Sequence, residues 1–231
     1  MKTLSIIIPV YNEKDFIRRA IEAAAKLDCQ KEIIVIDDCS IDGTGKELKK
    51  LQKEFDFKLL AHQKNQGKGA AIRTGLKKAE GLYSIVYDAD LEYQAQDILF
   101  LLEEMERAEK NSVKELAIYG SRFLRNYPKK LTLHYLANRF LTLLTNLFFG
   151  LKLTDMETCL KLCPTKILKE LELSFKRFEF EPEITAKLAR RGVVIIERPI
   201  QYLRRTYQQG KKIRFKDGLL AIKTLIKERL G

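Results

Sequence analysis

Short apolar runs alternate with helical repeats through the first half of the chain. A run of consecutive β-branched residues predicts a buried strand, and apolar residues three or four positions apart predict an amphipathic helix. Regular alternation of the two predicts an α/β fold with a mostly parallel sheet, right-handed crossovers and helices on both faces. The predicted strands are 4–10, 32–37, 57–61 and 82–87, and the predicted helices between them begin near Phe16, Thr44 and Asn65.

The pattern is less regular beyond residue 122. A predicted helix over about 97–109 and a predicted strand over 115–119 lead up to this point. The length of 231 residues fits one domain of ordinary size, which we divide into halves over about 1–122 and 123–231. In the second half the spacing predicts a strand over 193–197 and helices over about 131–149, 164–171, 183–191 and 216–230.

Two of these helices are amphipathic. The segment 131–149 contains Arg139 among its apolar residues, which argues against a helix that spans a membrane. It fits either a buried core helix or a helix that lies on a membrane surface. The last helix carries Lys223, Lys227 and Arg229 opposite an apolar face, and it fits docking on the core or on an anionic leaflet. The apolar stripe of 131–149 consists of Leu133, Leu136, Phe140, Leu143, Leu144 and Leu147.

Charge and cysteine content limit the classes of ligand and the cellular compartment that we expect. The chain has 43 basic and 31 acidic residues, a net charge of +12, which suits nucleic acid, anionic lipid or phosphorylated substrates. The absence of tryptophan and of a recognisable binding motif disfavours nucleic acid. We see no signal peptide, and the four cysteines show neither disulfide density nor zinc spacing. We therefore expect reduced thiols and a cytoplasmic protein.

The strongest chemical signal follows the fourth predicted strand. Asp88 and Asp90 stand one residue apart at its end, and Glu92 lies two residues further on. In open α/β sheets, ligands bind beyond the carboxyl ends of the strands. Carboxylates at this place can hold a hard divalent cation, which in turn binds the phosphates of a substrate. An acidic turn without a metal is the alternative, and it is disfavoured because two other strand ends carry motifs as well.

Two further features are compatible with a phosphate ligand. The pair Gly67 and Gly69 lacks the third glycine of a dinucleotide fingerprint, since Ile72 occupies that position, and it lacks the ending of a P-loop. It fits either a close backbone approach to a diphosphate or a tight strand-to-helix turn. Arg122, just past a predicted strand, can bind two phosphate oxygens with its planar guanidinium, or it is a solvated surface residue.

These motifs, in their order and spacing, resemble those of family 2 glycosyltransferases. The set consists of Pro9-x-Tyr11-Asn12-Glu13, Ile36-Asp37-Asp38-x-Ser40-x-Asp42-Gly43-Thr44, Asn65-x-Gly67-Lys68-Gly69 and Asp88-Ala89-Asp90. Two later motifs are similar to the branch of dolichyl-phosphate mannose synthases and bacterial polyprenyl-phosphate glycosyltransferases. They are Gly120-Ser121-Arg122 and Arg205 followed by Lys211-Lys212-Ile213. The resemblance covers nearly the whole chain.

The resemblance implies a single Rossmann-like domain of the GT-A type, with a nucleotide-sugar half over 1–122 and an acceptor half over 123–231. It implies that Asp88, Ala89 and Asp90 form a Mg²⁺ or Mn²⁺ and diphosphate site, with Glu92 as a further metal ligand. Related synthases often have Gln at the position of Glu92, which makes the site expected here more anionic. By the same resemblance the nucleoside is held by Pro9, Tyr11, Glu13, Ile36 and Asp38, and the phosphates by Arg122, Arg205 and either Lys211 or Lys212.

The expected reaction is an inverting transfer of a mannose- or glucose-type sugar from a GDP- or UDP-sugar to a polyprenyl or dolichyl phosphate. A lipid monophosphate, with a second pKa near ~6, needs no strong base. The alternative is a glycan hydroxyl acceptor, for which Asp155 or Glu157 is the candidate base. A nucleotidyltransferase is disfavoured, since the first strand-helix turn is not glycine-rich. We expect peripheral association with the cytoplasmic face of an anionic membrane, with a membrane subunit or a second copy as further partner.

Overall fold

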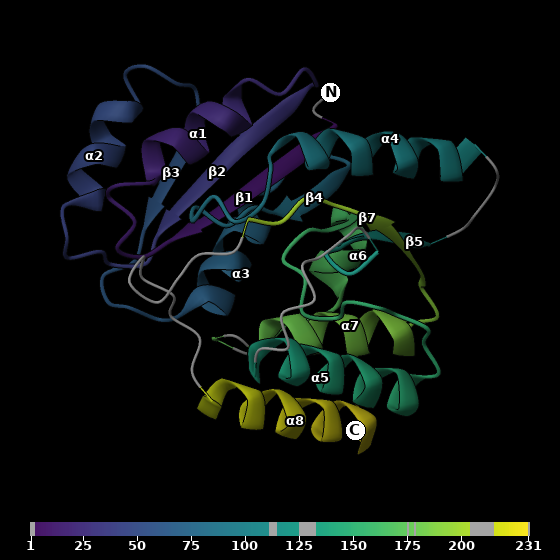
Figure 1. Cartoon of the computed structure of the whole chain (residues 1–231). Coiled ribbons are helices and arrows are strands. Elements are labelled where there is room, and N and C mark those ends of the chain that lie inside the picture. Colours follow the sequence, from purple (N-terminus) through teal and green to yellow (C-terminus); the bar gives the residue numbers. More distant parts are fainter. Residues whose placement is uncertain are drawn as a thin grey trace.

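A seven-stranded sheet organises the computed structural model, which describes residues 3–110, 115–124, 133–174, 176–177, 179–203 and 215–230 (Figure 1). The predicted residues Arg205, Lys211 and Lys212 lie outside this part of the chain. The strands are β1 (Leu4–Val10), β2 (Lys31–Asp37), β3 (Lys58–Ala61), β4 (Tyr83–Val86), β5 (Leu116–Ser121), β6 (Lys161–Pro164) and β7 (Val194–Pro199). The helices are α1 (Ile17–Ala25), α2 (Thr44–Leu51), α3 (Lys68–Lys78), α4 (Gln96–Lys110), α5 (Leu133–Phe149), α6 (Thr165–Glu170), α7 (Phe180–Arg190) and α8 (Phe215–Leu230).

The strand order is β3-β2-β1-β4-β6-β5-β7. Strands β1 to β4 are all parallel, with Leu4 of β1 opposite Lys31 of β2 and Tyr83 of β4. Strand β6 is antiparallel to both of its neighbours, β4 and β5, and β7 is parallel to β5. The prediction of a mostly parallel sheet is therefore confirmed, and the one strand that the sequence did not predict is the antiparallel β6.

Helices cover both faces of the sheet, as predicted. Figure 1 shows α1, α2 and α4 on one side and α3, α6 and α7 on the other. Strand β1 lies between β2 and β4 with helices above and below it, and its residues Leu4, Ile6, Ile7 and Ile8 are completely buried. Burial on both faces explains why its sequence is continuously apolar and not alternating.

Helices α5 and α8 form an outer layer that packs on α7 (Figure 1). The predicted apolar stripe of α5 is largely turned outwards, since Phe140 is 55% exposed and Leu147 is 72% exposed. The other side of α5 buries Leu141 and Thr145, so this helix is not enclosed in the core. Within the described residues, no helix has the length and apolar character required to cross a membrane. The outward apolar residues of the two helices are Leu136, Phe140, Leu143, Leu147, Leu219, Leu220, Ile226 and Leu230.

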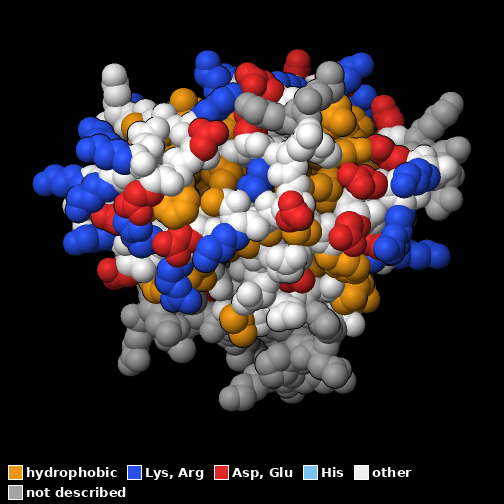
Figure 2. All heavy atoms as spheres, turned by 90° about the horizontal axis from the view of Figure 1, so that it is seen from above, with side chains coloured by type: hydrophobic (Ala, Val, Ile, Leu, Met, Phe, Trp, Pro, Cys, Tyr) orange, Lys and Arg blue, Asp and Glu red, His pale blue; other side chains and the backbone are white. Residues whose placement is uncertain are grey.

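The charged side chains do not form one basic face in the view of Figure 2. Lysine and arginine side chains alternate there with aspartate and glutamate across the part of the surface that is not drawn in grey. The described part of this face therefore shows no single basic patch of the kind that binds nucleic acid.

Candidate active site

Three loops meet at one edge of the sheet because β1, β2 and β4 are adjacent and parallel. The loops follow Val10, Asp37 and Val86, the last residues of these strands. Hydrogen bonds join the first two loops: the Asn12 amide donates to Ser40 Oγ at 2.9 Å, and the Ile41 amide donates to Asn12 Oδ1 at 2.9 Å. The structure thus brings together the first two predicted motifs, which lie almost 30 residues apart in the sequence.

The residues predicted to hold the nucleoside lie along these two strand ends. Pro9 and Tyr11 are half-buried, whereas Glu13 is buried and its amide donates to Thr44 Oγ1 at 3.0 Å. Ile36 is completely buried in β2, so any contact of this residue with a nucleoside is restricted to its backbone. Their roles as nucleoside ligands stay predictions.

Asp38 organises the loop that leads into α3. Its Oδ1 lies 2.7 Å from His62 Nδ1 and accepts the Gln66 amide at 2.8 Å, while its Oδ2 accepts the Gly67 amide at 2.7 Å. Gly67 has φ of +94°, and a Cβ there would lie 2.5 Å from the carbonyl oxygen of Lys176, which explains the glycine. The carboxylate of Asp38 therefore shapes this loop, and its predicted contact with the nucleoside stays a prediction.

Asp88 is paired with Lys68, the first residue of α3. The Lys68 Nζ lies 3.0 Å from Asp88 Oδ2 and 3.2 Å from Glu181 Oε1. Burial lowers the pKa of Lys68, but the carboxylates of Asp88 and Glu181 outweigh this effect and raise that pKa well above its usual value. Lys68 therefore stays protonated and positively charged at the predicted metal and diphosphate site.

Glu181 connects this pair to the second half of the chain. Its Oε2 lies 2.9 Å from the Nζ of Lys161, which is almost completely buried and also donates to the carbonyl groups of Met156 and Thr158. Lys161 thereby holds the loop 155–160 in place. No role was predicted for Lys68, Lys161 or Glu181. The available signal was Lys161 inside an otherwise apolar run, whereas Glu181 lies between Glu179 and Glu183 and does not stand out.

Asp90 and Glu92 belong to a hydrogen-bonded turn. Asp90 Oδ1 accepts the amide of Glu92 at 3.0 Å, and Glu92 Oε2 accepts the hydroxyl of Tyr202 at 2.5 Å. Over the described ranges, no three His, Cys, Asp or Glu side chains are grouped so that they could hold a metal ion. Asp88 and Asp90 alone still fit Mg²⁺ or Mn²⁺, because such ions often take one or two carboxylates and complete their shell with substrate phosphates. The role of Glu92 as a third ligand stays a prediction.

Arg122 is buried and ion-paired, so it is not a solvated surface arginine. Its Nε and Nη2 each donate to one oxygen of Asp155 at 2.7 Å, and its amide donates to the same carboxylate at 2.9 Å. The guanidinium carbon lies 5.2 Å from the ring centroid of Tyr202, which stacks against it. Asp155 is fully buried in this pair. Because Arg122 holds its carboxylate, Asp155 is not available as a general base. Of the two candidate bases for a hydroxyl acceptor, Glu157 remains.

Glu157, the other candidate base, is not held by an arginine as Asp155 is. Its Oε1 is buried without a hydrogen-bond partner within the described residues, as is the hydroxyl of neighbouring Thr158. Burial, followed by the charge of Glu181, raises the pKa of Glu157 from 4.5 to about 7. This carboxyl group therefore takes up and releases a proton near neutral pH, as a general acid or base requires.

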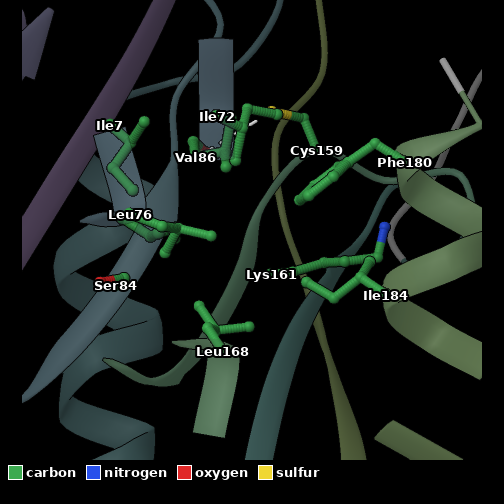
Figure 3. Close-up of a pocket in the computed structure, with 11 residues that line it drawn as sticks. Ile7, Ile72, Leu76, Ser84, Val86, Cys159, Lys161, Leu168, Phe180 and Ile184 are labelled. Carbon is green, nitrogen blue, oxygen red and sulfur yellow. Dashed lines mark hydrogen bonds between the residues drawn. The ribbon is translucent and has the colours of Figure 1, made fainter. Parts of the chain in front are cut away.

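A small apolar cavity lies behind the site, between the sheet and helices α3, α6 and α7 (Figure 3). Ile72, Leu76 and Phe180 line it, and the side chain of Lys161 passes along its wall towards α7. Its volume of about 10 Å³ is at the lower limit for one water molecule, so it is a packing void and not a substrate site.

Most of the chain is similar in sequence to known glycosyltransferases. Residues 5–172 match the sequence profile of the family described as glycosyl transferase family 2. The chain is 27% identical over 250 residues to a UDP-N-acetylglucosamine–dolichyl-phosphate N-acetylglucosaminyltransferase of Methanococcus voltae, with 100% of this chain and 97% of that protein covered. It is 28% identical over 130 residues to a dolichol-phosphate mannosyltransferase of Pyrococcus furiosus, which covers 54% of this chain and 36% of that protein.

The fold has counterparts among solved structures. The crystal structure of glucosyl-3-phosphoglycerate synthase from Mycobacterium tuberculosis, in complex with Mn²⁺, UDP and phosphoglyceric acid, superposes with a TM-score of 0.71. Its sequence identity is 16%, and the superposition covers 99% of this chain and 78% of that chain. At this identity the likeness shows the fold alone, which is the GT-A fold. Because the family profile matches well over half of the chain, this protein belongs to glycosyl transferase family 2 and is a glycosyltransferase.

Proposed function

We propose that this glycosyltransferase moves a mannose- or glucose-type sugar from a GDP- or UDP-sugar to a polyprenyl or dolichyl phosphate. The observation that carries the proposal is the position of Asp88 and Asp90 beside the loops that follow β1 and β2, at the shared carboxyl edge of the sheet. Nucleotides bind at this edge in open α/β sheets. The relatives from Methanococcus voltae and Pyrococcus furiosus, both named for dolichyl or dolichol phosphate, support the acceptor class.

In the proposed reaction an oxygen of the acceptor phosphate forms a bond to the anomeric carbon of the sugar. The bond from that carbon to the nucleoside diphosphate breaks, and the configuration inverts. Asp88 and Asp90 are the residues that would hold Mg²⁺ or Mn²⁺, which when bound supplies Lewis-acid stabilisation of the departing diphosphate. The ammonium of Lys68, which lies between Asp88 and Glu181, adds a positive charge to the site.

The candidate bases Asp155 and Glu157 are not required if the acceptor is a phosphate. A lipid monophosphate is already largely ionised at neutral pH and needs no strong base. Asp155 is occupied by Arg122, so the described part of the acceptor half offers Glu157 as the remaining candidate. Our proposed phosphate contacts are Arg122, which would bind phosphate while it stays paired with Asp155, and Arg205 with Lys211 or Lys212. The last three residues lie outside the described part of the chain.

A hydroxyl acceptor is the second candidate function, and the unpartnered Oε1 of Glu157 is the observation that favours it. With a pKa of about 7, Glu157 can accept the proton of an attacking hydroxyl. The variant Glu157→Gln separates the two functions. Transfer to a hydroxyl would fall by about 10²-fold or more, whereas transfer to a lipid phosphate would keep its turnover within a few-fold.

We further propose that the outer layer of α5 and α8 rests on the cytoplasmic face of an anionic membrane. The outward residues Leu143 and Leu147 of α5 and the basic residues Lys223 and Lys227 of α8 support it. Sedimentation with anionic liposomes tests this proposal. The double variant Leu143→Ser/Leu147→Ser should bind them less, and Leu82→Ser, at an exposed apolar residue before β4, is the control. Equal recovery of the wild type with and without liposomes would contradict it.

The donor is tested with a panel of GDP- and UDP-sugars, a short polyprenyl phosphate and Mg²⁺ or Mn²⁺. Release of nucleoside diphosphate that requires the lipid phosphate would support the proposal and identify the donor. Release that is equal without lipid phosphate would indicate water or another acceptor. No release from any donor, together with no nucleotide binding by calorimetry, would contradict the proposed function.

A further inference from the structure

The ammonium of Lys68 lies between two carboxylates that come from different parts of the fold. It is 3.0 Å from Asp88 Oδ2, at the end of β4, and 3.2 Å from Glu181 Oε1, on α7. The Lys68 side chain is 17% exposed, that of Glu181 is 6% exposed and that of Asp88 is 21% exposed, so Asp88 is the more accessible of the two carboxylates to a cation from solvent. Lys68 thus neutralises a carboxylate that the proposed function assigns to a divalent cation.

The surroundings fix Lys68 at its backbone and Glu181 at its far oxygen. The amide of Gly67, next to Lys68, donates to Asp38, and the amide of Ala70 donates to the carbonyl of Lys176 at 3.0 Å. Glu181 Oε2 is held by Lys161 Nζ at 2.9 Å. Glu181 therefore remains in place as an acceptor for Lys68 even if Asp88 binds another cation.

A divalent cation and an ammonium group cannot both contact the same oxygen of Asp88 without strong repulsion between them. We infer that Lys68 is an exchangeable internal counter-ion of Asp88, which retreats to Glu181 when a divalent cation binds. This inference rests on the proposed metal site. Lys68 is then a positioning residue that weakens metal binding to the free enzyme. The metal ion binds tightly only when the phosphate oxygens of the donor complete its coordination shell.

The test is a titration of Mn²⁺ without nucleotide, with unbound Mn²⁺ read from its electron paramagnetic resonance signal. The variant Lys68→Met should bind Mn²⁺ about tenfold or more tightly than wild type, since Asp88 loses its competing cation. Glu181→Gln should bind it several-fold more weakly, since Lys68 keeps only Asp88 as a charged partner. Lys64→Met removes one positive charge from an exposed position of the same loop, and we expect it to change the affinity by less than about twofold.

Two results would overturn the inference. One is a Lys68→Met variant that binds Mn²⁺ no more tightly than Lys64→Met, and the other is a Glu181→Gln variant that binds it more tightly than wild type. If Lys68→Met does not fold, Glu181→Gln decides the question. The same titration with UDP or GDP added separates the two proposals. Wild type that binds no Mn²⁺ even then would refute the metal site itself, whereas normal wild-type binding with unchanged variants would refute only the role of Lys68.

Discussion

Replacing Glu157 with glutamine should stabilise the protein at alkaline pH and much less at acidic pH. The folded chain raises the pKa of Glu157 from 4.5 to about 7, because its carboxyl group is buried and lies near Glu181. Lys161 and Arg122 also face this group and lower that pKa, but each is paired with its own carboxylate. Since one pKa unit corresponds to about 1.4 kcal/mol, the ionised group destabilises the folded chain by on the order of 3 kcal/mol.

The sign follows from proton linkage. Between pH 4.5 and about 7 the folded chain binds more protons at Glu157 than the unfolded chain does, so this group lowers stability as the pH rises. Below this window the destabilisation is absent, and above it the destabilisation is complete. Glutamine has the same shape and cannot ionise. The gain from Glu157→Gln should therefore be roughly 2 kcal/mol larger at pH 8 than at pH 5.

Denaturant unfolding at the two pH values measures this difference. For a chain of this size, 1 kcal/mol corresponds to about 2–4 °C in Tm, so thermal unfolding provides an independent reading. The control Glu103→Gln makes the same chemical change at an exposed position on α4, and it should change stability by less than about 0.5 kcal/mol. A Glu157→Gln effect that is equal at pH 5 and pH 8, or a loss of stability that grows towards pH 8, would refute the reasoning.

Three further predictions concern the site. Asp88→Asn should reduce transfer by about 10²-fold or more while the protein stays folded, as turnover assays and circular dichroism would show; full turnover would contradict its metal role. Arg122→Lys should lower the free energy of unfolding by about 1–3 kcal/mol, because lysine cannot make both hydrogen bonds to Asp155. Gly67→Ala should destabilise by about 1–3 kcal/mol or more, since its φ is positive and its Cβ would meet Lys176; unchanged unfolding midpoints would contradict either prediction.

The sequence predicted the strands whose burial leaves a simple pattern. Strands β1, β2 and β4 are apolar because both of their faces are covered, and their predicted bounds agree closely with the structure. Strand β6 was missed because it has four residues, begins with a lysine and ends at Pro164. Its Lys161 is tolerated in the sheet only because Glu181 and two carbonyl groups satisfy the buried ammonium.

Helix α7 shows a second limit of local patterns. The prediction began this helix at Glu183, after Pro182, whereas the structure begins it at Phe180. Proline is acceptable in the first turn of a helix, where its missing amide hydrogen has no helical partner. A proline near the predicted start therefore did not mark the boundary.

The candidate site also contains residues that the sequence predicted and residues that it did not. Asp88 and Asp90 were predicted because they are neighbours in sequence at a strand end, and this short spacing survives in the fold. Lys68 and Glu181 are 113 positions apart in the sequence, and the residues around each of them do not predict that they pair. The fold brings these charges together because the first turns of α3 and α7 lie on the same side of the sheet, where Ile72 and Phe180 line one cavity.

The most direct test of the proposed function is the mass of the lipid product formed from a polyprenyl phosphate and the active nucleotide-sugar. We predict a product that carries one added sugar unit on an intact phosphate. That product should be absent with Asp88→Asn and also when polyprenol replaces the phosphate. A sugar transferred equally well to polyprenol or to a glycan hydroxyl, with no glycosylated lipid phosphate, would contradict the account.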